Sequence, residues 1–234
     1  YYMYHKSLEN KKVETSEAKR TRKASIVKQF IILVRRYAKI TWADKQRFFM
    51  LLLQAPFIGM LIGMVSAKDS FEIYESSKQV LFTLACSAVW IGVLNSIQEI
   101  CKERAVLKRE TSVNLRLFPY IMSKVVVLGT LCLIQSILLT GIVFLFITFP
   151  DVSFTGNILL EVTAFTYLTT MAATSMGLLV SAMVTNSDRA MGLAPLLLIP
   201  QILFSGVLFK LEGVTKIISY FAISRWSMAA YGIL

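Results

Sequence analysis

The chain has 234 residues, of which 56% are hydrophobic and 17% are charged. Soluble domains average about 25% charged residues, so this composition excludes an ordinary soluble globular protein. The formal net charge is +11, but the basic residues flank long apolar stretches, which argues against a nucleic-acid partner. Several of these stretches approach the ~20 residues that a helix needs to cross a bilayer. We therefore expect an all-α, polytopic membrane protein in contact with the lipid bilayer.

The sequence contains few residues of the types that usually serve in catalysis or metal binding. The three cysteines, Cys86, Cys101 and Cys132, lie in or beside apolar stretches without CxxC spacing, which argues against a disulfide framework or a zinc site. The only histidine, His5, lies in the polar N-terminal tail. We expect no catalytic residue, no bound metal and no cofactor in this chain.

The N-terminal part divides into two segments. Residues 1–24 are polar, basic and aperiodic, and we interpret them as a cytoplasmic linker. In residues 25–47, apolar side chains recur at helical spacing and basic ones occupy another face. This pattern predicts an amphipathic helix along the membrane surface, with Trp42 at the headgroup level. The alternative, a surface helix of a soluble domain, is disfavoured because a spanning segment follows at once.

Five apolar stretches follow, and the first contains Gly59 and Gly63 at the GxxxG spacing that permits close helix approach. Residues 210–234 are only intermittently apolar, so we expect an extracytoplasmic amphipathic or re-entrant segment there. We expect an even number of spans, and therefore a further span besides the five visible here. The five expected spans cover residues 48–66, 80–97, 121–149, 158–185 and 191–209.

The distribution of basic residues predicts the orientation. About half of the 25 Lys and Arg residues precede residue 48, and half of the others lie in residues 98–124. Basic residues concentrate on the cytoplasmic side of membrane proteins. We therefore place the N-terminus and the second basic segment in the cytoplasm, in a plasma or inner membrane.

Residues 98–114 carry a dense run of both charges between two apolar spans. Charge pairs within a helix contribute only about 0.2–0.5 kcal/mol each, so helix stability alone does not explain this density. A mixed-charge surface suits docking of another protein domain, where complementary charges fix the register. The alternative is a solvated turn.

A resemblance favours the docking interpretation. The segment "ERAVLKRETSVNLRLFPYIMSK", residues 103–124, resembles the intracellular loop of the G subfamily of ATP-binding cassette (ABC) transporters. Residues 29–63 are similar to the connecting helix and first span of bacterial relatives with an ABC-2 type permease domain. The matching residues are Gln29, Leu33, Arg36, Asp44, Gly59, Gly63, Glu103, Arg104, Ala105, Val106, Arg109, Glu110, Pro119 and Tyr120.

The resemblance implies a type V exporter fold with six spans and a coupling helix over about residues 98–114. The coupling helix receives motion from a cytoplasmic nucleotide-binding domain. The acidic residues of the run would contact that domain or the connecting helix, with Arg36 and Arg35 as ionic partners. The residues expected to take part in coupling are Glu99, Glu103, Arg104, Arg109, Glu110, Arg35 and Arg36.

The resemblance also implies a dimer of two membrane domains around a central hydrophobic cavity lined by the second and fifth spans. Carried onto this sequence, the pathway candidates are Phe82, Val89, Leu203, Phe204 and Leu208. Each of them could instead face lipid or pack between helices.

One feature of the G subfamily is missing. The sequence has no G-x-x-x-x-G-K-[ST] loop to cradle phosphates. We therefore expect ATP and Mg²⁺ to bind a partner nucleotide-binding domain, either fused upstream or a separate subunit.

Polar side chains inside the spans leave alternatives open. Glu161 lies near the outer edge of the fourth span, where it is an interfacial carboxylate or a proton or cation site. Gln54, Gln135 and Gln201 either bond to neighbouring helices or meet substrate.

The favoured interpretation is the permease domain of an ABC exporter of a lipophilic or amphipathic substrate, working by alternating access as a homodimer. One rival is an ion-coupled secondary transporter with Glu161 as the coupling acid, although no internal repeat is visible. The other rival is a membrane scaffold that docks a soluble partner without transport. A membrane-embedded enzyme lacks the residues for its chemistry.

Overall fold

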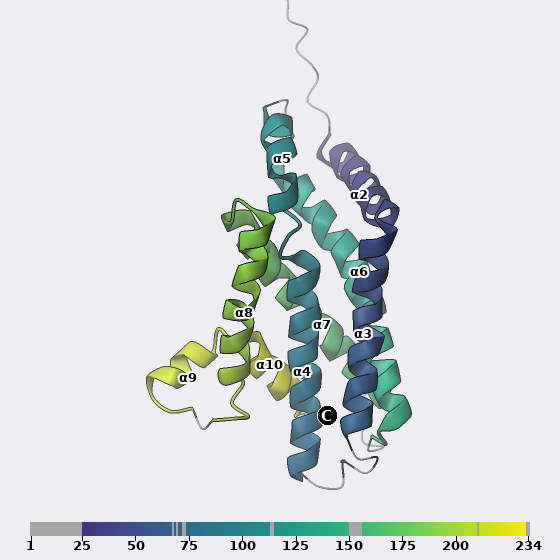
Figure 1. The fold of residues 1–234 in the computed structure, drawn as a ribbon, viewed down its shortest axis with the longest axis vertical. Helices are drawn as coiled ribbons and strands as arrows, with labels where there is room; N and C mark the ends of the chain where they lie inside the picture. Colours follow the sequence, from purple (N-terminus) through teal and green to yellow (C-terminus); the bar gives the residue numbers. More distant parts are fainter. Residues whose placement is uncertain are drawn as a thin grey trace, which may run out of the picture.

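The computed structural model describes residues 25–66, 68, 70–71, 74–112, 115–149, 156–209 and 211–232. Every regular element in these residues is a helix, and the long helices run roughly along one axis (Figure 1). The linker expected over residues 1–24 lies outside the described residues. The expected all-α membrane architecture is confirmed.

Four helical stretches in the described part of the chain are long and apolar enough to cross a membrane. They are α3 (Lys45–Val65), the stretch that begins with α4 (Tyr74–Ser96), α6 (Leu117–Phe146) and α7 (Ile158–Met183). They correspond to the first four expected spans. The fifth, expected over residues 191–209, differs and is described below.

Helix α2 (Ile26–Ala43) takes the place of the expected amphipathic helix. It buries Leu33 and Tyr37, whereas Trp42 is exposed. The helix ends at Asp44, whose side chain accepts a hydrogen bond from the Arg47 backbone N–H at 3.3 Å. An aspartate in this place caps a new helix, so the chain passes directly from α2 into the first span.

Helices α3 and α6 approach closely at the two glycines. A Cβ atom added to Gly59 would lie 3.0 Å from the carbonyl oxygen of Leu139. One added to Gly63 would lie 2.5 Å from the ring of Phe146. The missing side chains therefore let the two backbones meet, as the GxxxG spacing predicts.

Helix α4 is the centre of the bundle, and it packs against α7 through small residues. A Cβ atom on Gly92 would collide with the backbone of Thr170, and one on Gly177 would collide with Ser96 Oγ. Ala85, Ala88 and other apolar residues of α4 are fully buried. Close packing of small residues is what holds helices together where water provides no hydrophobic force.

The expected fifth span is shorter than predicted and displaced. Helix α8 (Ser187–Leu203) has 17 residues, which reach about 26 Å at about 1.5 Å each. It is not among the four stretches long enough to cross a membrane in the described residues. After Leu203 the chain turns, with Gly206 at a φ of 80°. That conformation is accessible to glycine and interrupts the helix that hydrophobicity alone extends to residue 209.

Two short helices, α9 (Val214–Ser219) and α10 (Ile223–Tyr231), occupy the segment expected to be amphipathic or re-entrant. Helix α10 turns back onto α4 and α7 (Figure 1). Tyr231 Oη and Thr166 Oγ1 lie 2.8 Å apart, and Thr169 Oγ1 donates to Ser227 Oγ at 2.9 Å.

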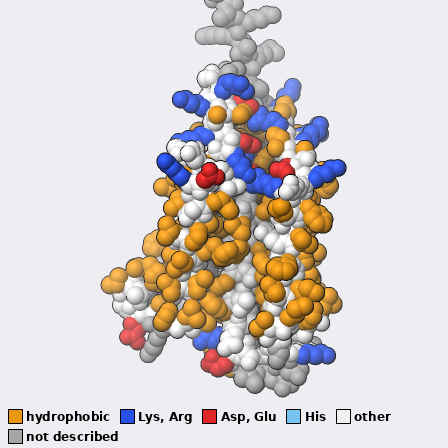
Figure 2. Space-filling model, in the orientation of Figure 1, with side chains coloured by type: hydrophobic (Ala, Val, Ile, Leu, Met, Phe, Trp, Pro, Cys, Tyr) orange, Lys and Arg blue, Asp and Glu red, His pale blue; other side chains and the backbone are white. Residues whose placement is uncertain are grey.

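Charges gather at one end of the molecule. Figure 2 shows Lys, Arg, Asp and Glu side chains concentrated around α2 and α5 (Arg104–Thr111), above a broad band of hydrophobic side chains. The band covers the long helices, as expected for surfaces that face lipid.

Candidate functional site

A buried lysine lies where the charged run meets the third span. Lys124, in the second turn of α6, is only 1% exposed. Its Nζ lies 3.0 Å from Glu103 Oε2 and 3.7 Å from Glu99 Oε2. Burying an ammonium is costly unless an opposite charge accompanies it. The structure therefore places the Lys124 ammonium between two carboxylates.

Two tyrosines complete the surroundings of Lys124. Its Nζ lies 4.0 Å from the ring centroid of Tyr37 and 5.3 Å from that of Tyr120, within reach of cation–π attraction. Tyr37 Oη donates to Glu99 Oε2, and Tyr120 Oη donates to Glu103 Oε2 at 2.9 Å. Burial and the neighbouring Glu99 carboxylate raise the pKa of Tyr37 well above its usual value. The phenol therefore stays protonated and keeps donating.

The start of the first span joins the same group. Arg47, in the first turn of α3, donates from Nη2 to Glu99 Oε1. Glu99 thus contacts side chains from α2, α3 and α6 at once. We call this group the charge cluster: Tyr37, Arg47, Glu99, Glu103, Tyr120 and Lys124.

A separate ion pair joins α2 to α5. Arg36 Nη1 lies 2.6 Å from Glu110 Oε1, and Arg36 Nη2 lies 3.1 Å from Glu110 Oε2. The hydrogen bond to Glu110 raises the pKa of Arg36 further above its ordinary value. This two-point contact fixes the orientation of α5 against α2 more firmly than a single bond does.

The charged run forms two short helices with different attachments. The first, η1 (Cys101–Glu103), follows a bend in which the backbone N–H groups of Ile100 and Cys101 donate to Ser181 Oγ at 2.9 and 3.1 Å. At the start of α5, Arg104 Nη1 donates to the carbonyl oxygen of Val184 at 2.9 Å. The run is therefore fastened to the end of α7 as well as to α2 and α6.

The outer face of α5 remains open. Arg109 is exposed, and it lines a groove of about 490 Å³ together with Arg36, Glu110 and Leu115. Arg35 is also exposed, and no hydrogen bond or ion pair ties it to any part of the chain that the structure describes. The expected coupling residues thus divide into an inward group and an exposed group.

Comparison with known proteins identifies the family of the chain. Residues 28–233 match the family described as ABC-2 type transporter. The chain is also 26% identical over 225 residues to an ABC transporter ATP-binding/permease protein of Mycobacterium tuberculosis. That alignment covers 88% of this chain and 25% of the relative.

This chain belongs to the ABC-2 type transporter family. It is a multi-pass membrane protein and a transport domain. In the family, such domains work with ATP-binding subunits, and the mycobacterial relative is named for both an ATP-binding and a permease part. The chain spans about a quarter of the length of that relative.

The five pathway candidates of the ABC-2 domain differ in exposure. Leu203 and Leu208 are 40% and 53% exposed, and Phe82 and Phe204 are half-buried. Val89 is 1% exposed and packs with residues of α7 and α8. Val89 would reach a pathway only if these helices separate, and the roles of all five residues remain predictions.

The glutamines inside the spans bond to neighbouring helices. Gln54 Nε2 donates to Asn95 Oδ1 at 3.1 Å, and Asn95 Nδ2 donates to Gln135 Oε1. Gln135 Nε2 in turn donates to the Leu51 carbonyl oxygen at 2.7 Å. Gln201 Oε1 accepts from the backbone N–H of Ser224 at 3.2 Å.

Sequence reasoning missed several residues that hold the site together: Tyr37, Arg47, Lys124 and Ser181. Lys124 carried a usable signal, because a lone lysine inside an apolar span near a run of glutamates needs a partner. Ser181 carried none, since a serine near a helix end is common in any membrane protein.

Proposed function

We propose that this chain is the permease domain of an ATP-driven exporter, in which η1 and α5 receive motion from a nucleotide-binding domain. The observation that carries the proposal is the way in which the charged run is built into the bundle. Glu99 and Glu103 hold it to α2, α3 and α6, and Ser181 holds it to α7. A displacement of α5 would therefore be transmitted through these contacts to every span that they reach.

The docking surface for the nucleotide-binding domain is the exposed side of α5 and its groove with α2. Arg109 and Lys108 are exposed on α5, where they can meet acidic groups of a partner domain. In this proposal the N-terminus and α5 lie on the cytoplasmic side of a plasma or inner membrane, and the concentration of basic residues around α2 and α5 supports this orientation (Figure 2).

The nucleotide-binding domain is fused to this chain or is a separate subunit, and it binds ATP and Mg²⁺ and performs the hydrolysis. The permease contributes no catalytic group. Among the described residues, no group of His, Cys, Asp and Glu side chains is arranged to hold a metal ion.

A second copy of the chain completes the transport path. Trp90 on α4 is 45% exposed, and Leu196 and Ile199 on α8 are 63% and 52% exposed. Pairing two copies across α4 and α8 would bury these side chains and enclose a hydrophobic cavity near Phe82 and Leu203. An apolar cavity suits a lipophilic or amphipathic substrate, which alternating access would carry outward.

The test is ATP hydrolysis by the native complex in lipid, with Arg109→Ala compared against Arg116→Ala. Both arginines are exposed near α5, but only Arg109 lines the groove. We expect Arg109→Ala to reduce the ATPase activity several-fold without changing the thermal unfolding midpoint, and Arg116→Ala to leave both unchanged.

Two results would contradict the proposal. If no ATPase activity accompanies the purified chain, the protein is a membrane scaffold or an ion-coupled transporter instead. If both arginine variants reduce ATP hydrolysis equally, α5 and its groove are not the docking surface.

A further inference from the structure

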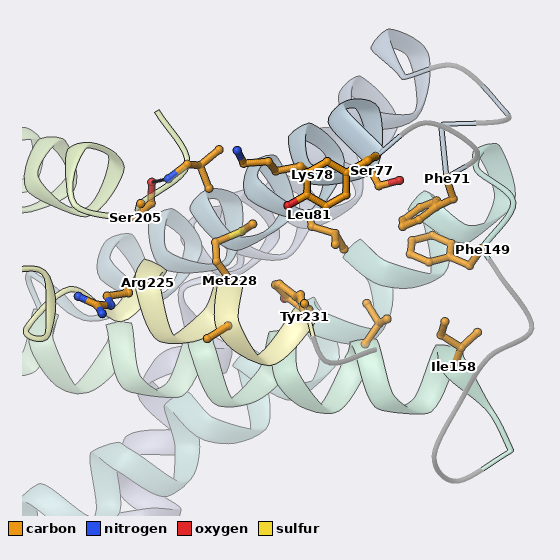
Figure 3. A pocket seen from close by; sticks show the side chains of 16 residues that line it. Phe71, Ser77, Lys78, Leu81, Phe149, Ile158, Ser205, Arg225, Met228 and Tyr231 are labelled. Atoms are coloured by element: carbon orange, nitrogen blue, oxygen red, sulfur yellow. Dashed lines mark hydrogen bonds between the residues drawn. The ribbon is translucent and has the colours of Figure 1, made fainter. Parts of the chain in front are cut away.

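A second pocket lies at the end of the bundle where α4 begins, opposite α5 (Figure 1), and the proposed transport cycle does not use it. Figure 3 shows the side chains that line it. Its volume is about 440 Å³, within the range of about 300–1,000 Å³ that is usual for small-molecule sites. Its walls come from the start of α4, the segment after α6, the start of α7, the turn after α8, and α10. We call it the outer pocket.

One side of the outer pocket is an aromatic and aliphatic wall. Phe71 and Phe149 lie with their ring centroids 4.4 Å apart, and Phe149 stacks on Phe144 at 3.9 Å. Leu81 and Met228 extend this wall. Such a surface favours a hydrocarbon chain, because removing apolar groups from water is favourable.

The outer pocket also contains a cation that has no partner among the described residues. Lys78 lines it and is half-buried, and the described chain offers its ammonium no hydrogen bond and no ion pair. Figure 3 places Phe71 and Phe149 on one side and Ser205 and Arg225 on the other, with Lys78 between them. No carboxylate is among the lining residues that the structure describes.

Arg225, the other basic residue of the lining, is already engaged. Its Nη1 donates to the carbonyl oxygen of Lys216 at 3.1 Å and to Ser219 Oγ. Its guanidinium lies 4.1 Å from the ring centroid of Tyr220. Both side chains attract an anion, but of the two only Lys78 has a charged group without a partner among the described residues.

We propose that the outer pocket binds an anionic amphiphile, with a phosphate or carboxylate head on Lys78 and a single hydrocarbon chain along Phe149 and Met228. A free anion would leave the apolar wall uncovered, and a neutral lipid would leave the ammonium unpaired. Only a molecule that carries both parts satisfies both surfaces. The site binds without nucleotide, so the proposal does not rest on ATP-driven transport.

The test measures equilibrium binding of radiolabelled lysophosphatidylglycerol to the full transporter in phosphatidylcholine nanodiscs without ATP. We expect Lys78→Gln to weaken binding about tenfold, since a hydrogen bond to a charged group is lost. Lys78→Arg should retain binding. Lys68→Gln is the matched control, because Lys68 is exposed and is not part of the lining of the outer pocket.

Two competitors distinguish the parts of the ligand. Unlabelled monoacylglycerol of the same chain length tests the chain alone, and inorganic phosphate tests the head alone. We expect neither to displace the probe at concentrations where unlabelled lysophosphatidylglycerol does. Leu81→Trp, checked for folding by size-exclusion chromatography, should block the pocket and abolish binding.

The proposal is overturned if Lys78→Gln binds within roughly twofold of the wild type. It is also overturned if monoacylglycerol competes as well as the phospholipid, because the charge would then have no role. If inorganic phosphate displaces the probe at the same concentration, the pocket is a simple phosphate site and the amphiphile proposal is wrong.

Discussion

Two polar regions join α4 to α6, one near the basic end of the bundle and one further into the apolar band. The first uses full charges: Lys124 of α6 lies against Glu99 and Glu103, just beyond α4. The second uses neutral amides: Asn95 lies between Gln54 and Gln135. A charge at the bilayer centre costs about 2.5–3.5 kcal/mol even by modest scales. The full charges therefore lie at the end of the bundle, where water and headgroups are near.

The two regions also differ in what they touch. The amide group bonds only the spans α3, α4 and α6 to one another. The charge cluster, in contrast, includes Tyr37 from α2, a helix outside the spans. This difference suggests that the amides fix the bundle and that the charges link it to elements that a cytoplasmic partner can move.

The largest effect is expected when the charge cluster loses its lysine. Lys124→Met leaves the buried Glu99 and the half-buried Glu103 without their ammonium, which should lower the free energy of unfolding by about 3–5 kcal/mol. Thermal unfolding of the purified protein in detergent measures the loss. Lys108→Met, on the exposed side of α5, is the control and should change little.

A triple variant sharpens this result. Lys124→Met combined with Glu99→Gln and Glu103→Gln removes all three charges, so most of the lost stability should return. If Lys124→Met is itself as stable as the wild type, the charges contribute nothing to the fold.

The second expected effect is a loss of stability at alkaline pH. The pKa of Tyr37 is raised above the usual value of 10.0, so above that pH the unfolded chain loses the phenolic proton while the folded chain keeps it. Tyr37 should therefore cost about 1.4 kcal/mol of stability by pH 11. The difference between wild type and Tyr37→Phe across pH 9 to 11 measures it. An unchanged difference would mean that the phenol is not protected.

The amide region should respond more weakly. Asn95→Leu removes the partner shared by Gln54 and Gln135, and hydrogen bonds between membrane helices average about 0.6 kcal/mol, with a maximum near 1.7. We expect a loss in that range by thermal unfolding. Thr130→Val, at an exposed site on α6, is the control. A loss as large as that of Lys124→Met would erase the contrast between the two regions.

The smallest effect on stability is expected at the ion pair between α2 and α5. Arg36→Gln breaks the contact with Glu110, and partly exposed pairs contribute about 0.2–1 kcal/mol. Its larger consequence should be reduced ATP hydrolysis by the complex, because α5 loses its orientation. Arg35→Gln is the neighbouring control. Equal effects of both variants would show that the pair does not position α5.

Much of the architecture is contained in the sequence. The length of an apolar stretch and the thickness of a bilayer together set the first four spans, and the GxxxG spacing of Gly59 and Gly63 indicates where α3 meets α6. The charged run is equally visible, and its resemblance to a known intracellular loop agrees with the family that the comparison shows. Hydrophobicity and local spacing suffice to predict these features because the bilayer sets the length and the apolar composition of each span.

Only the tertiary structure decided the direction of each charged side chain. Arg35 and Arg36 are neighbours, yet successive residues of a helix point about 100° apart, and only Arg36 reaches Glu110. The inward turn of Glu99 and Glu103 depends on Lys124, and the end of α8 depends on a turn at Gly206. These outcomes are set by partners far along the chain and by backbone geometry, and among them only the pairing of Lys124 with glutamates left a signal in the sequence.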